Sequence, residues 1–333
     1  MDLPLAYIES FHVFLAALVF NVTICSAERL NRALSSPLAQ TSRFVDLLER
    51  RYNRPELTEE MRKNEGISTV ATFILMALLI GLAFGWGLSL VPYGWVAEAL
   101  IIGTLLPVRS HLDNSRSIER ALSNSLEEGR AFLAFVSPRE TQGLDEAGVA
   151  RGAIEVTART TVDGVIAPFF WYGLFGLAGF LVFRVVNIAA QLIDERTHFA
   201  ACFGWFAARA NDALLWVPTR IAGLFIAFAA LFVRQGHPIK AVSTMLRDAP
   251  KRPNQVFTWS FAAMAGALNV RLGGPRIYYQ EPLDSPWLGD GQRYPDTTDI
   301  HRGRLVFLWA CSLVILCTVL LALIAAPLPL SIY

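Results

Sequence analysis

Long apolar runs alternate with charged segments along this chain. The runs 67–91 and 306–330 contain no charged residue, and the runs 165–193 and 214–233 each contain a single arginine. About 20 consecutive apolar residues cross the hydrocarbon core of a bilayer as an α-helix. We therefore expect each of these four runs to span a membrane as a helix.

Two further apolar runs give a weaker signal. The run 3–25 contains Glu9 and His12 but lacks a basic start and a small-residue cleavage site, so it is typical of a retained helix rather than a signal peptide. The run 95–108 contains Glu98 and has only 14 residues. As a helix these residues rise about 21 Å, short of the roughly 30 Å core. A short span and a re-entrant helix are both open for it.

The basic residues favour one membrane topology. Lys and Arg gather in the polar segments 29–66, 109–164 and 234–305, whereas 194–213 has few of them. Basic segments tend to stay on the cytoplasmic face of a membrane. This rule favours about six crossings, with 95–108 among them, both termini outside and the sparse segment 194–213 on the outer face.

Composition agrees with a membrane protein. Of the 333 residues, 54% are hydrophobic and 17% are charged, against about 45 to 50% and about 25% in soluble domains, and the mean hydropathy is +0.42. We predict an all-α, polytopic membrane bundle of about five to six membrane helices, built as a single domain over 1–333. Amphipathic helices are expected between 109 and 158. The long segment 234–305, rich in Gly, Pro and aromatic residues, is expected to form an ordered, irregular loop.

Several classes of function fit this sequence poorly. The net charge of +1 gives no overall basic field for nucleic acid. The four cysteines form no C-x-x-C pair and the five histidines are scattered, which argues against a disulfide scaffold and a zinc site. The sequence has no G-x-x-x-x-G-K-[ST] phosphate loop and no nucleophile elbow. It also lacks the matching half-repeats expected of many transporters.

Three polar clusters remain as candidates for chemistry. In the first, Glu155 and Arg159 are helical neighbours, and Asp163 lies at the mouth of an apolar run. In the second, Arg209 and Asp212 share a helical face close to the membrane. The plainer explanations are a cap or turn at Asp163 and a structural ion pair in the second cluster.

Arginine stands out in the remaining candidates. Arg220 lies inside an apolar run, where a charge is costly and usually serves a site or a partner. The third cluster is a Gly-rich stretch that combines Gly273 and Gly274 with charged residues, among them Arg276 and Asp290; solvated loop charges are its plainer explanation. Nearly all the positive charge is Arg, whose planar guanidinium suits phosphate and carboxylate groups, although a GC-rich genome alone accounts for such a bias.

Several stretches of the sequence resemble one family. In chain order they read LDEAGVARGAIE, TVDGVIAPFFW, FGWFAAR, MAGALNVRLGGP and PWLGDG, the last followed by Asp299 and Ile300. From about 53 to 305 the chain resembles the CobD/CbiB family, the membrane-bound adenosylcobinamide-phosphate synthases of cobalamin biosynthesis. The resemblance implies a multi-pass protein of a bacterial inner membrane. It also implies ATP-dependent formation of an amide between a propionate carboxylate of adenosylcobyric acid and the amine of an aminopropanol phosphate, with ATP and Mg²⁺ as cofactors and the corrinoid as a substrate.

This chemistry suggests roles for the candidate residues. Activation of a carboxylate through an acyl phosphate calls for Mg²⁺ ligands and for cations that bind phosphoryl oxygens. We predict Asp163, Asp212 and Glu155 as catalytic. Candidates for Mg²⁺ are Asp163, Asp212 and Asp290, without a firm assignment of the metal ligands. The predicted substrate-binding residues are Arg139, Asn187, Arg209, Arg220, Gly273, Gly274, Arg276 and Asp290.

The chain departs from the family's pattern at five polar positions. Members have Glu and Asn where this chain has Arg159 and Thr160, and acidic residues where it has Ala190, Asn211 and Phe261. A second function therefore stays open, that of a non-catalytic CobD/CbiB-like or AmpE-like membrane protein with a ligand-binding or regulatory role. The expected partners are the corrinoid, an amino-alcohol phosphate and the lipid bilayer, but not nucleic acid. A homo-oligomer and contacts with other proteins of the cobalamin pathway are also open.

Overall fold

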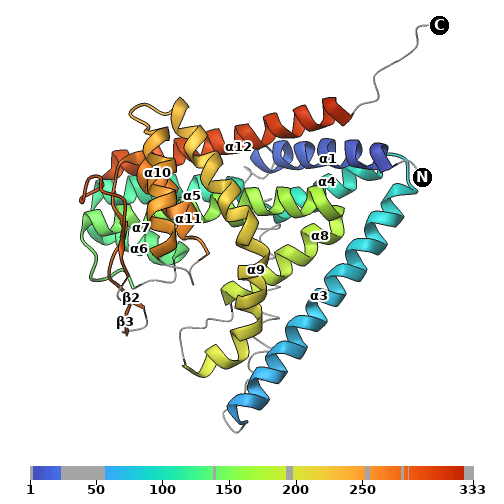
Figure 1. Cartoon of the computed structure of the whole chain (residues 1–333), viewed down its shortest axis with the longest axis horizontal. Coiled ribbons are helices and arrows are strands. Elements are labelled where there is room, and N and C mark those ends of the chain that lie inside the picture. Colours follow the sequence, from blue (N-terminus) through green and yellow to red (C-terminus); the bar gives the residue numbers. More distant parts are fainter. Residues whose placement is uncertain are drawn as a thin grey trace, which may run out of the picture.

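The computed structural model describes residues 3–23, 57–137, 140–192, 198–251, 256–278, 281–283 and 285–325. Almost all of its elements are helices (Figure 1). In chain order they are α1 (Leu3–Thr23), α3 (Glu59–Ser89), α4 (Gly94–Leu105), α5 (Val108–Asn124), α6 (Leu126–Val136), α7 (Glu146–Thr160), η1 (Thr161–Ile166), α8 (Ala167–Leu192), α9 (His198–Ala229), η2 (Ala230–Phe232), α10 (Pro238–Asp248), η3 (Ala249–Lys251), α11 (Thr258–Leu268) and α12 (Thr297–Ala325). Short strands pair antiparallel in the Gly-rich loop, β1 (Leu272–Gly273) with β4 (Trp287–Leu288) and β2 (Arg276–Tyr278) with β3 (Glu281–Leu283).

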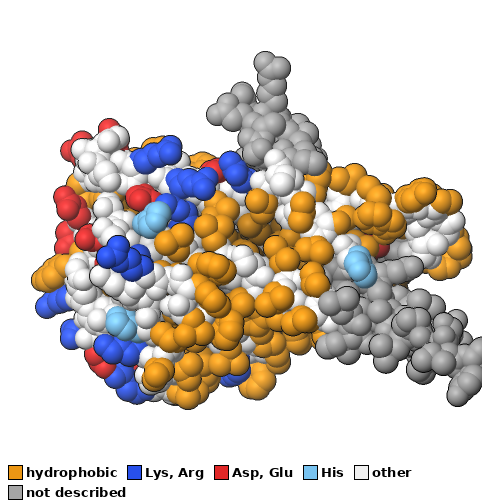
Figure 2. Space-filling view, turned by 90° about the horizontal axis from the view of Figure 1, so that it is seen from above, with side chains coloured by type: hydrophobic (Ala, Val, Ile, Leu, Met, Phe, Trp, Pro, Cys, Tyr) orange, Lys and Arg blue, Asp and Glu red, His pale blue; other side chains and the backbone are white. Residues whose placement is uncertain are grey.

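Four helical segments in the described part of the chain are long and apolar enough to cross a membrane: Glu59–Ser89, Glu146–Leu192, Cys202–Phe232 and Thr297–Leu321. Figure 2 shows apolar side chains over the middle of the molecule and charged side chains gathered at one end. In Figure 1 the same end of the molecule holds α5, α6, α7, α10 and the start of α12. The predicted all-α, polytopic membrane bundle is confirmed.

Small residues let α3 lie close to its neighbours. A side chain added at Gly81 would come within 2.4 Å of the Ala178 backbone in α8, and one at Gly66 within 2.0 Å of the Phe203 carbonyl oxygen in α9. Small residues at helix contacts are typical of membrane bundles, because they allow backbones to approach. The outer face of α3 instead exposes large apolar side chains, as lipid contact requires: Leu75, Leu79, Leu82 and Phe84.

The run 165–193, expected as one spanning helix, forms two helices that double back. The chain leaves the helical conformation at Phe175 (φ −132°, ψ 15°) and Gly176 (φ 59°, ψ −150°). Glycine adopts the Gly176 conformation without the strain that a side chain would add. α8 therefore runs outward, turns at these two residues and comes back, as its ribbon shows in Figure 1.

This turn changes which residues lie together. A straight helix would separate Asp163 and Gln191 by about 42 Å, at 1.5 Å per residue. Instead Gln191 Nε2 lies 3.3 Å from Asp163 Oδ2. The expected topology, with 194–213 on the outer face, assumed that the preceding run crosses the membrane once as a straight helix. The turn inside α8 removes that assumption.

A hydrogen bond next to a proline connects α8 to α9. Pro218 lies inside α9 and has no backbone N–H, so the carbonyl of Leu214, four residues earlier, loses its helical donor. Trp171, from the outward half of α8, supplies a donor in its place. Its indole Nε1–H lies 3.1 Å from the Leu214 oxygen. Trp171 therefore satisfies the carbonyl that Pro218 leaves without its helical donor.

A buried asparagine holds the junction of α4 and α5. Asn21 of α1 donates through Nδ2 to the carbonyls of Gly103 and Leu106, both at 2.8 Å, and its Oδ1 accepts from the Arg109 N–H at 3.0 Å. One side chain thus satisfies backbone groups at the end of α4 and the start of α5. α4 is the short apolar run of the sequence, and its 12 residues rise about 18 Å.

Two apolar cores meet at the start of the membrane helices. The first joins α1, α4, α8 and α12 around Phe14 and Tyr172, and the second joins α9, α10, α11 and α12 around Met264. The helix formed by α7 and η1 passes from one to the other, since Ala158 belongs to the second core and Val162 to the first. The charged residues on this helix are therefore held between the two cores.

Candidate functional site

Four charged side chains of alternating sign lie along α7 and η1. Arg151, Glu155, Arg159 and Asp163 are spaced four residues apart, and residues four apart share one face of a helix. Glu155 and Asp163 are buried, whereas the Arg159 side chain is 31% exposed. We call these four residues the charged row. It runs from the loop-rich charged end toward the membrane helices.

The first half of the charged row holds the Gly-rich loop. The Gly273 N–H donates to Glu155 Oε1 at 2.8 Å. The Arg151 guanidinium lies over the ring of Trp287, 4.8 Å from its centre, and donates to the Arg293 carbonyl at 3.1 Å. The structure therefore brings Glu155, a predicted catalytic residue, into contact with Gly273, a predicted substrate-binding residue.

Two glycines shape the loop at this contact. Gly273 and Gly274 have φ of 79° and 76°, a region that favours glycine. A side chain on Gly274 would meet the ring of Trp287 at 2.5 Å. Both glycines thus allow the loop to turn beside Trp287, while direct contact of either one with a substrate stays a prediction.

The second half of the charged row joins a buried polar network. We call it the Asp163 network, and its members are Arg159, Asp163, Arg184, Asn187, Gln191 and Asn211. Asp163 lies in η1, a π-helix, a form often found at functional sites. Its Oδ2 accepts from Arg159 Nε and from Gln191 Nε2, both at 3.3 Å. Its backbone carbonyl accepts from Arg184 Nη1 at 3.5 Å.

The returning half of α8 supplies most of this network. Arg184, Asn187 and Gln191 are three and four residues apart, so they share one helical face. Gln191 Nε2 also donates to Asn187 Oδ1 at 2.8 Å, and Asn187 Nδ2 donates to Asn211 Oδ1 of α9 at 3.1 Å. Arg184, Asn187 and Asn211 are all buried. The turn inside α8 is what lets these side chains reach η1.

Sequence reasoning identified part of this network. It selected Asp163 and Asn187 but not Arg184, Gln191 or Asn211. A usable signal was present, because three polar residues at helical spacing interrupt the end of an otherwise apolar run. Nothing in the sequence shows that this end of the run returns to Asp163.

Departures from the family pattern gather at the same place. Arg159 and Asn211 are members of the network. Phe261 stacks on Phe257, with ring centres 6.2 Å apart, and the Arg159 guanidinium lies 4.8 Å from the centre of the Phe257 ring. Three of the five positions that depart from the expected family pattern thus lie within or beside the Asp163 network.

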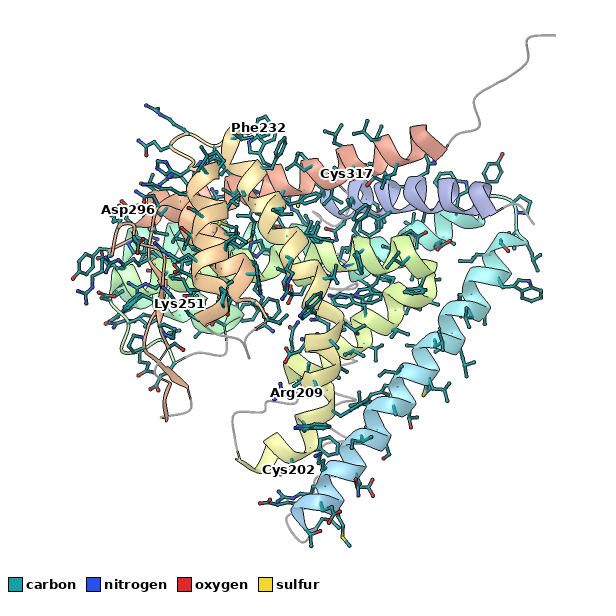
Figure 3. All side chains as sticks on the ribbon, viewed as in Figure 1. Cys202, Arg209, Phe232, Lys251, Asp296 and Cys317 are labelled. Atoms are coloured by element: carbon teal, nitrogen blue, oxygen red, sulfur yellow. The ribbon has the colours of Figure 1, made fainter. Side chains whose placement is uncertain are left out.

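Two predicted binding residues on α9 have partners outside the network. The Arg220 guanidinium lies between the rings of Trp216 and Trp259, 3.9 and 4.4 Å from their centres, and donates to the Trp216 carbonyl. These cation–π contacts explain how an apolar run accommodates this charge. Arg209, on the lower half of α9 in Figure 3, pairs with Asp212 at 3.6 Å, with side chains 56% and 37% exposed.

Asp290 belongs to a second acidic site at the charged end. Its side chain is 75% exposed and pairs with Arg247. Arg247 and Lys251 also bind the buried Asp248, at 2.8 and 2.6 Å, and the Gly289 N–H donates to Asp248 Oδ2 at 2.8 Å. Burial raises the pKa of Asp248, but these hydrogen bonds outweigh it and hold the pKa well below its usual range. Asp248 was not predicted from the sequence, because its loop partner is 41 residues away.

The remaining predicted residues bear on phosphate and metal binding. Arg139 lies outside the described residues, and for Arg276 the structure describes only the backbone, in β2. Within the described ranges, no group of three or more His, Cys, Asp or Glu side chains could hold a metal ion. The carboxylates considered for Mg²⁺, Asp163, Asp212 and Asp290, therefore do not form one cluster. A Mg²⁺ ion bound through one carboxylate and substrate phosphates needs no such cluster.

Comparisons with known proteins cover most of the chain. A family model described as CobD/Cbib protein matches residues 14–307. Cobalamin biosynthesis protein CobD of Sinorhizobium sp is 32% identical over 306 residues, which cover 89% of this chain and 93% of that protein. The CobD proteins of Rhodobacter capsulatus and Rhizobium meliloti (strain 1021) are 31% identical over 286 residues and 30% identical over 329 residues. These alignments cover 84% and 98% of this chain, and 87% and 99% of the two relatives. No solved structure matches the chain significantly.

Proposed function

The chain belongs to the CobD/CbiB family, and we propose that it joins adenosylcobyric acid to aminopropanol or its phosphate through an ATP-dependent amide bond. The product is then adenosylcobinamide or its phosphate. Family membership supports a role in cobalamin biosynthesis and corrinoid-type substrates, whereas the amide-forming step is our own proposal. With four candidate membrane spans, we further propose the inner membrane of a bacterium as its location.

The Asp163 network is the observation that most supports this reaction. It brings two guanidinium groups to Asp163: Arg159 donates to its carboxylate and Arg184 donates to its backbone carbonyl. Amide formation from a carboxylate needs cations for carboxylate and phosphoryl oxygens. It also needs a base for the proton of the attacking amine. The network offers both kinds of group at the start of the membrane helices.

The proposed reaction has two steps. A carboxylate oxygen of adenosylcobyric acid attacks the γ-phosphorus of ATP, ADP leaves, and an acyl phosphate forms. The amine then attacks the carbonyl carbon, the C–N bond forms, and phosphate leaves. Arg159 and Arg184 stabilise the anionic oxygens, and Asp163 takes the proton that the amine loses. Mg²⁺, when bound together with ATP, would supply further positive charge for the phosphoryl oxygens.

The other predicted residues have supporting roles in this proposal. Asp212 follows Asn211 of the network in sequence and is the candidate carboxylate for Mg²⁺. Glu155 positions the Gly-rich loop through the Gly273 amide. The arginines outside the network, Arg209 and Arg220, and the loop residues Gly274, Arg276 and Asp290 are candidates for contacts with the corrinoid and the amino-alcohol phosphate.

A specific observation favours a second candidate function. Three of the five residues that depart from the family pattern lie around Asp163, with Arg159 and Asn211 inside the network and Phe261 stacked beside it. A protein that had lost catalysis but kept its scaffold would show changes concentrated in this way. The second candidate is therefore a CobD/CbiB-like protein that binds a corrinoid without forming the amide.

Growth rescue separates the two candidates. The full-length protein is expressed in a bacterial strain that lacks its own synthase, on a medium in which added cobyric acid is the sole corrinoid and growth requires its conversion to cobalamin. Rescue is the expected result. Failure of rescue, with the protein present in the membrane at levels that suffice for a functional relative, contradicts the ligase. Binding of adenosylcobyric acid by that inactive protein would then favour the second candidate.

Asp163→Asn tests the site within the same assay. This change keeps the size of the side chain but removes the base, so we expect the rate of amide formation in isolated membranes to fall about 10²-fold or more. Asp113→Asn is the matched control, since Asp113 is 44% exposed and pairs with Arg109 on α5. Equal activity of the two variants would remove Asp163 from the chemistry.

A further inference from the structure

The Asp163 network has unequal numbers of positive and negative groups. Arg159 and Arg184 are two cations, and in the described part of the chain the one carboxylate of this network is that of Asp163, which pairs with Arg159, while Arg184 donates to the Asp163 backbone carbonyl. The other members are neutral amides. Among the described members of the network, the positive groups therefore outnumber the negative groups by one. Arg184 is on a helix in the apolar part of the molecule, where an unmatched charge is costly.

The hydrogen-bond donors of the Arg184 guanidinium are also poorly used within the described residues. It is 6% exposed, and its Nη1 makes a long hydrogen bond of 3.5 Å to the Asp163 carbonyl. Its Nε has no hydrogen-bond partner among the described residues. A guanidinium carries its N–H donors in a planar fork that matches the two oxygens of a carboxylate. A buried donor without an acceptor lowers the stability of the folded protein. Such donors are therefore found mainly where function requires them.

We propose that Arg184 is the anchor of a binding site for a carboxylate, which supplies both the missing negative charge and the missing acceptor oxygens. A carboxylate carries a single charge, equal to the excess, whereas a phosphate monoester carries about −1.5 to −2 at neutral pH. The partly exposed Arg159 and the exposed Gln191 connect this site to the surface.

The inference deepens the proposed function and rests on it for the identity of the natural ligand, the carboxylate to be activated. Arg184 holds that carboxylate by two N–H···O bonds and orients it beside Asp163. Arg184 was not among the residues that the sequence analysis selected. Its role as an anchor can be tested without the full reaction, because a small carboxylate fills the same requirement.

Thermal unfolding of the purified full-length protein in a non-ionic detergent provides the test. Sodium propionate is the probe, propionamide is its neutral analogue and inorganic phosphate is the competing anion, all at constant ionic strength. We expect propionate to raise the Tm of the wild-type protein, with propionamide causing no shift and phosphate a smaller one. Titration of the Tm shift then gives an apparent Kd for propionate.

Substitutions identify the group that binds. Arg184→Gln should weaken propionate binding about 10- to 100-fold, as expected for loss of a charged hydrogen-bond donor, and Arg184→Lys should weaken it less. Arg116→Gln, which changes an arginine that is 43% exposed on α5, should respond like the wild type. Without propionate, Arg184→Gln should melt at or above the wild-type Tm, because the change removes the excess charge. An arginine with a purely structural role would instead lower the Tm when replaced.

Several results would overturn the inference. Equal stabilisation of wild type and Arg184→Gln by propionate would do so, as would a propionate effect no larger than that of propionamide. A stronger effect of phosphate that depends on Arg184 would show that the site binds a phosphoryl group rather than a carboxylate. If Arg184→Gln does not accumulate, Arg184→Lys and the wild-type comparison of propionate with propionamide decide the question. Growth rescue without propionate binding would reject this inference alone, and propionate binding without rescue would reject the proposed function alone.

Discussion

Two buried aspartates differ in how completely neighbouring groups supply hydrogen bonds and opposite charge to their carboxylates. Asp248 lies at the charged end, and Asp163 lies at the start of the membrane helices. Asp248 receives Arg247 and Lys251 at 2.8 and 2.6 Å, and a loop amide at 2.8 Å. Both cations are about half exposed, so water also reaches them. This aspartate fastens the Gly-rich loop to α10 and is itself paired with two cations and a backbone amide.

The surroundings of Asp163 are less complete. Its carboxylate accepts two hydrogen bonds of 3.3 Å, and Arg184 beside it retains an Nε without a partner among the described residues. Burial is similar at the two aspartates, so burial does not separate a structural site from a functional one. The two kinds of site are separated by the completeness of hydrogen bonding and charge pairing, because buried polar groups rarely lack partners unless a ligand or a water supplies them.

The largest expected loss of stability comes from removing Asp248. Asp248→Ala leaves the buried Gly289 N–H without an acceptor and frees the loop from α10, and we expect it to lower the free energy of unfolding by about 2 to 3 kcal/mol. Unfolding in detergent followed by circular dichroism measures this loss. Asp290→Ala is the control, because Asp290 is 75% exposed on the same Arg247. Equal effects of the two substitutions would break the comparison between the aspartates.

A smaller loss of unfolding free energy is expected at the contact between α8 and α9, where Trp171 donates a hydrogen bond to the Leu214 carbonyl. Trp171→Phe removes the indole donor to the Leu214 carbonyl and should cost about 1 to 2 kcal/mol. In a Pro218→Ala background the cost should be smaller, since residue 218 then has an N–H for that carbonyl. A double-mutant cycle on Tm or unfolding free energy measures the difference. Identical costs in both backgrounds would show that Trp171 acts through packing alone.

The smallest expected effect is a pH dependence at His111, a buried group whose Nε2 has no partner among the described residues. Burial, with the Arg304 charge adding to it, lowers the pKa of His111 to about 4, whereas an unfolded histidine has a pKa of about 6.5. The unfolded chain therefore binds this proton first as the pH falls. Stability is complete above about pH 6.5 and is lost between pH 6.5 and about 4.

We expect a loss of about 1 kcal/mol between pH 8 and pH 5.5 from this group. His111→Leu should remove that part of the pH dependence, because leucine does not titrate. Unfolding midpoints of the wild type and the variant across this range provide the measurement. The same slope in both proteins would mean that an unpartnered buried histidine does not influence stability here.

The sequence predicted the class of fold well, because that class follows from local composition. Uncharged runs such as 67–91 are long enough to cross a bilayer, and the structure has its long apolar helices there. The turn in α8 was not predicted. Gly176 is one of several glycines in an apolar run, and only its positive φ, set by the packing of the two halves, distinguishes it.

The site was predicted in part for the same reason. Asp163 was found because it marks the mouth of an apolar run, which is a local signal. Arg184 and Gln191 were missed because they reach Asp163 only through the turn in α8. Asp248 was missed because the amide that it accepts from belongs to Gly289, in a distant loop. Long-range pairing of this kind leaves no periodicity in the sequence.

The Asp163 network depends on the turn in α8, which brings Arg184, Asn187 and Gln191 to Asp163. Spin labels at Thr160 and Leu192, in a variant without native cysteines, measure it directly by double electron–electron resonance. A pair at Leu174 and Leu192 serves as control, because a separation of about 25 Å is expected for it with or without the turn. We predict a distance between 160 and 192 of less than half of the roughly 48 Å that a straight helix would give. A distance near 48 Å would contradict the turn, the Asp163 network and the carboxylate site built on it.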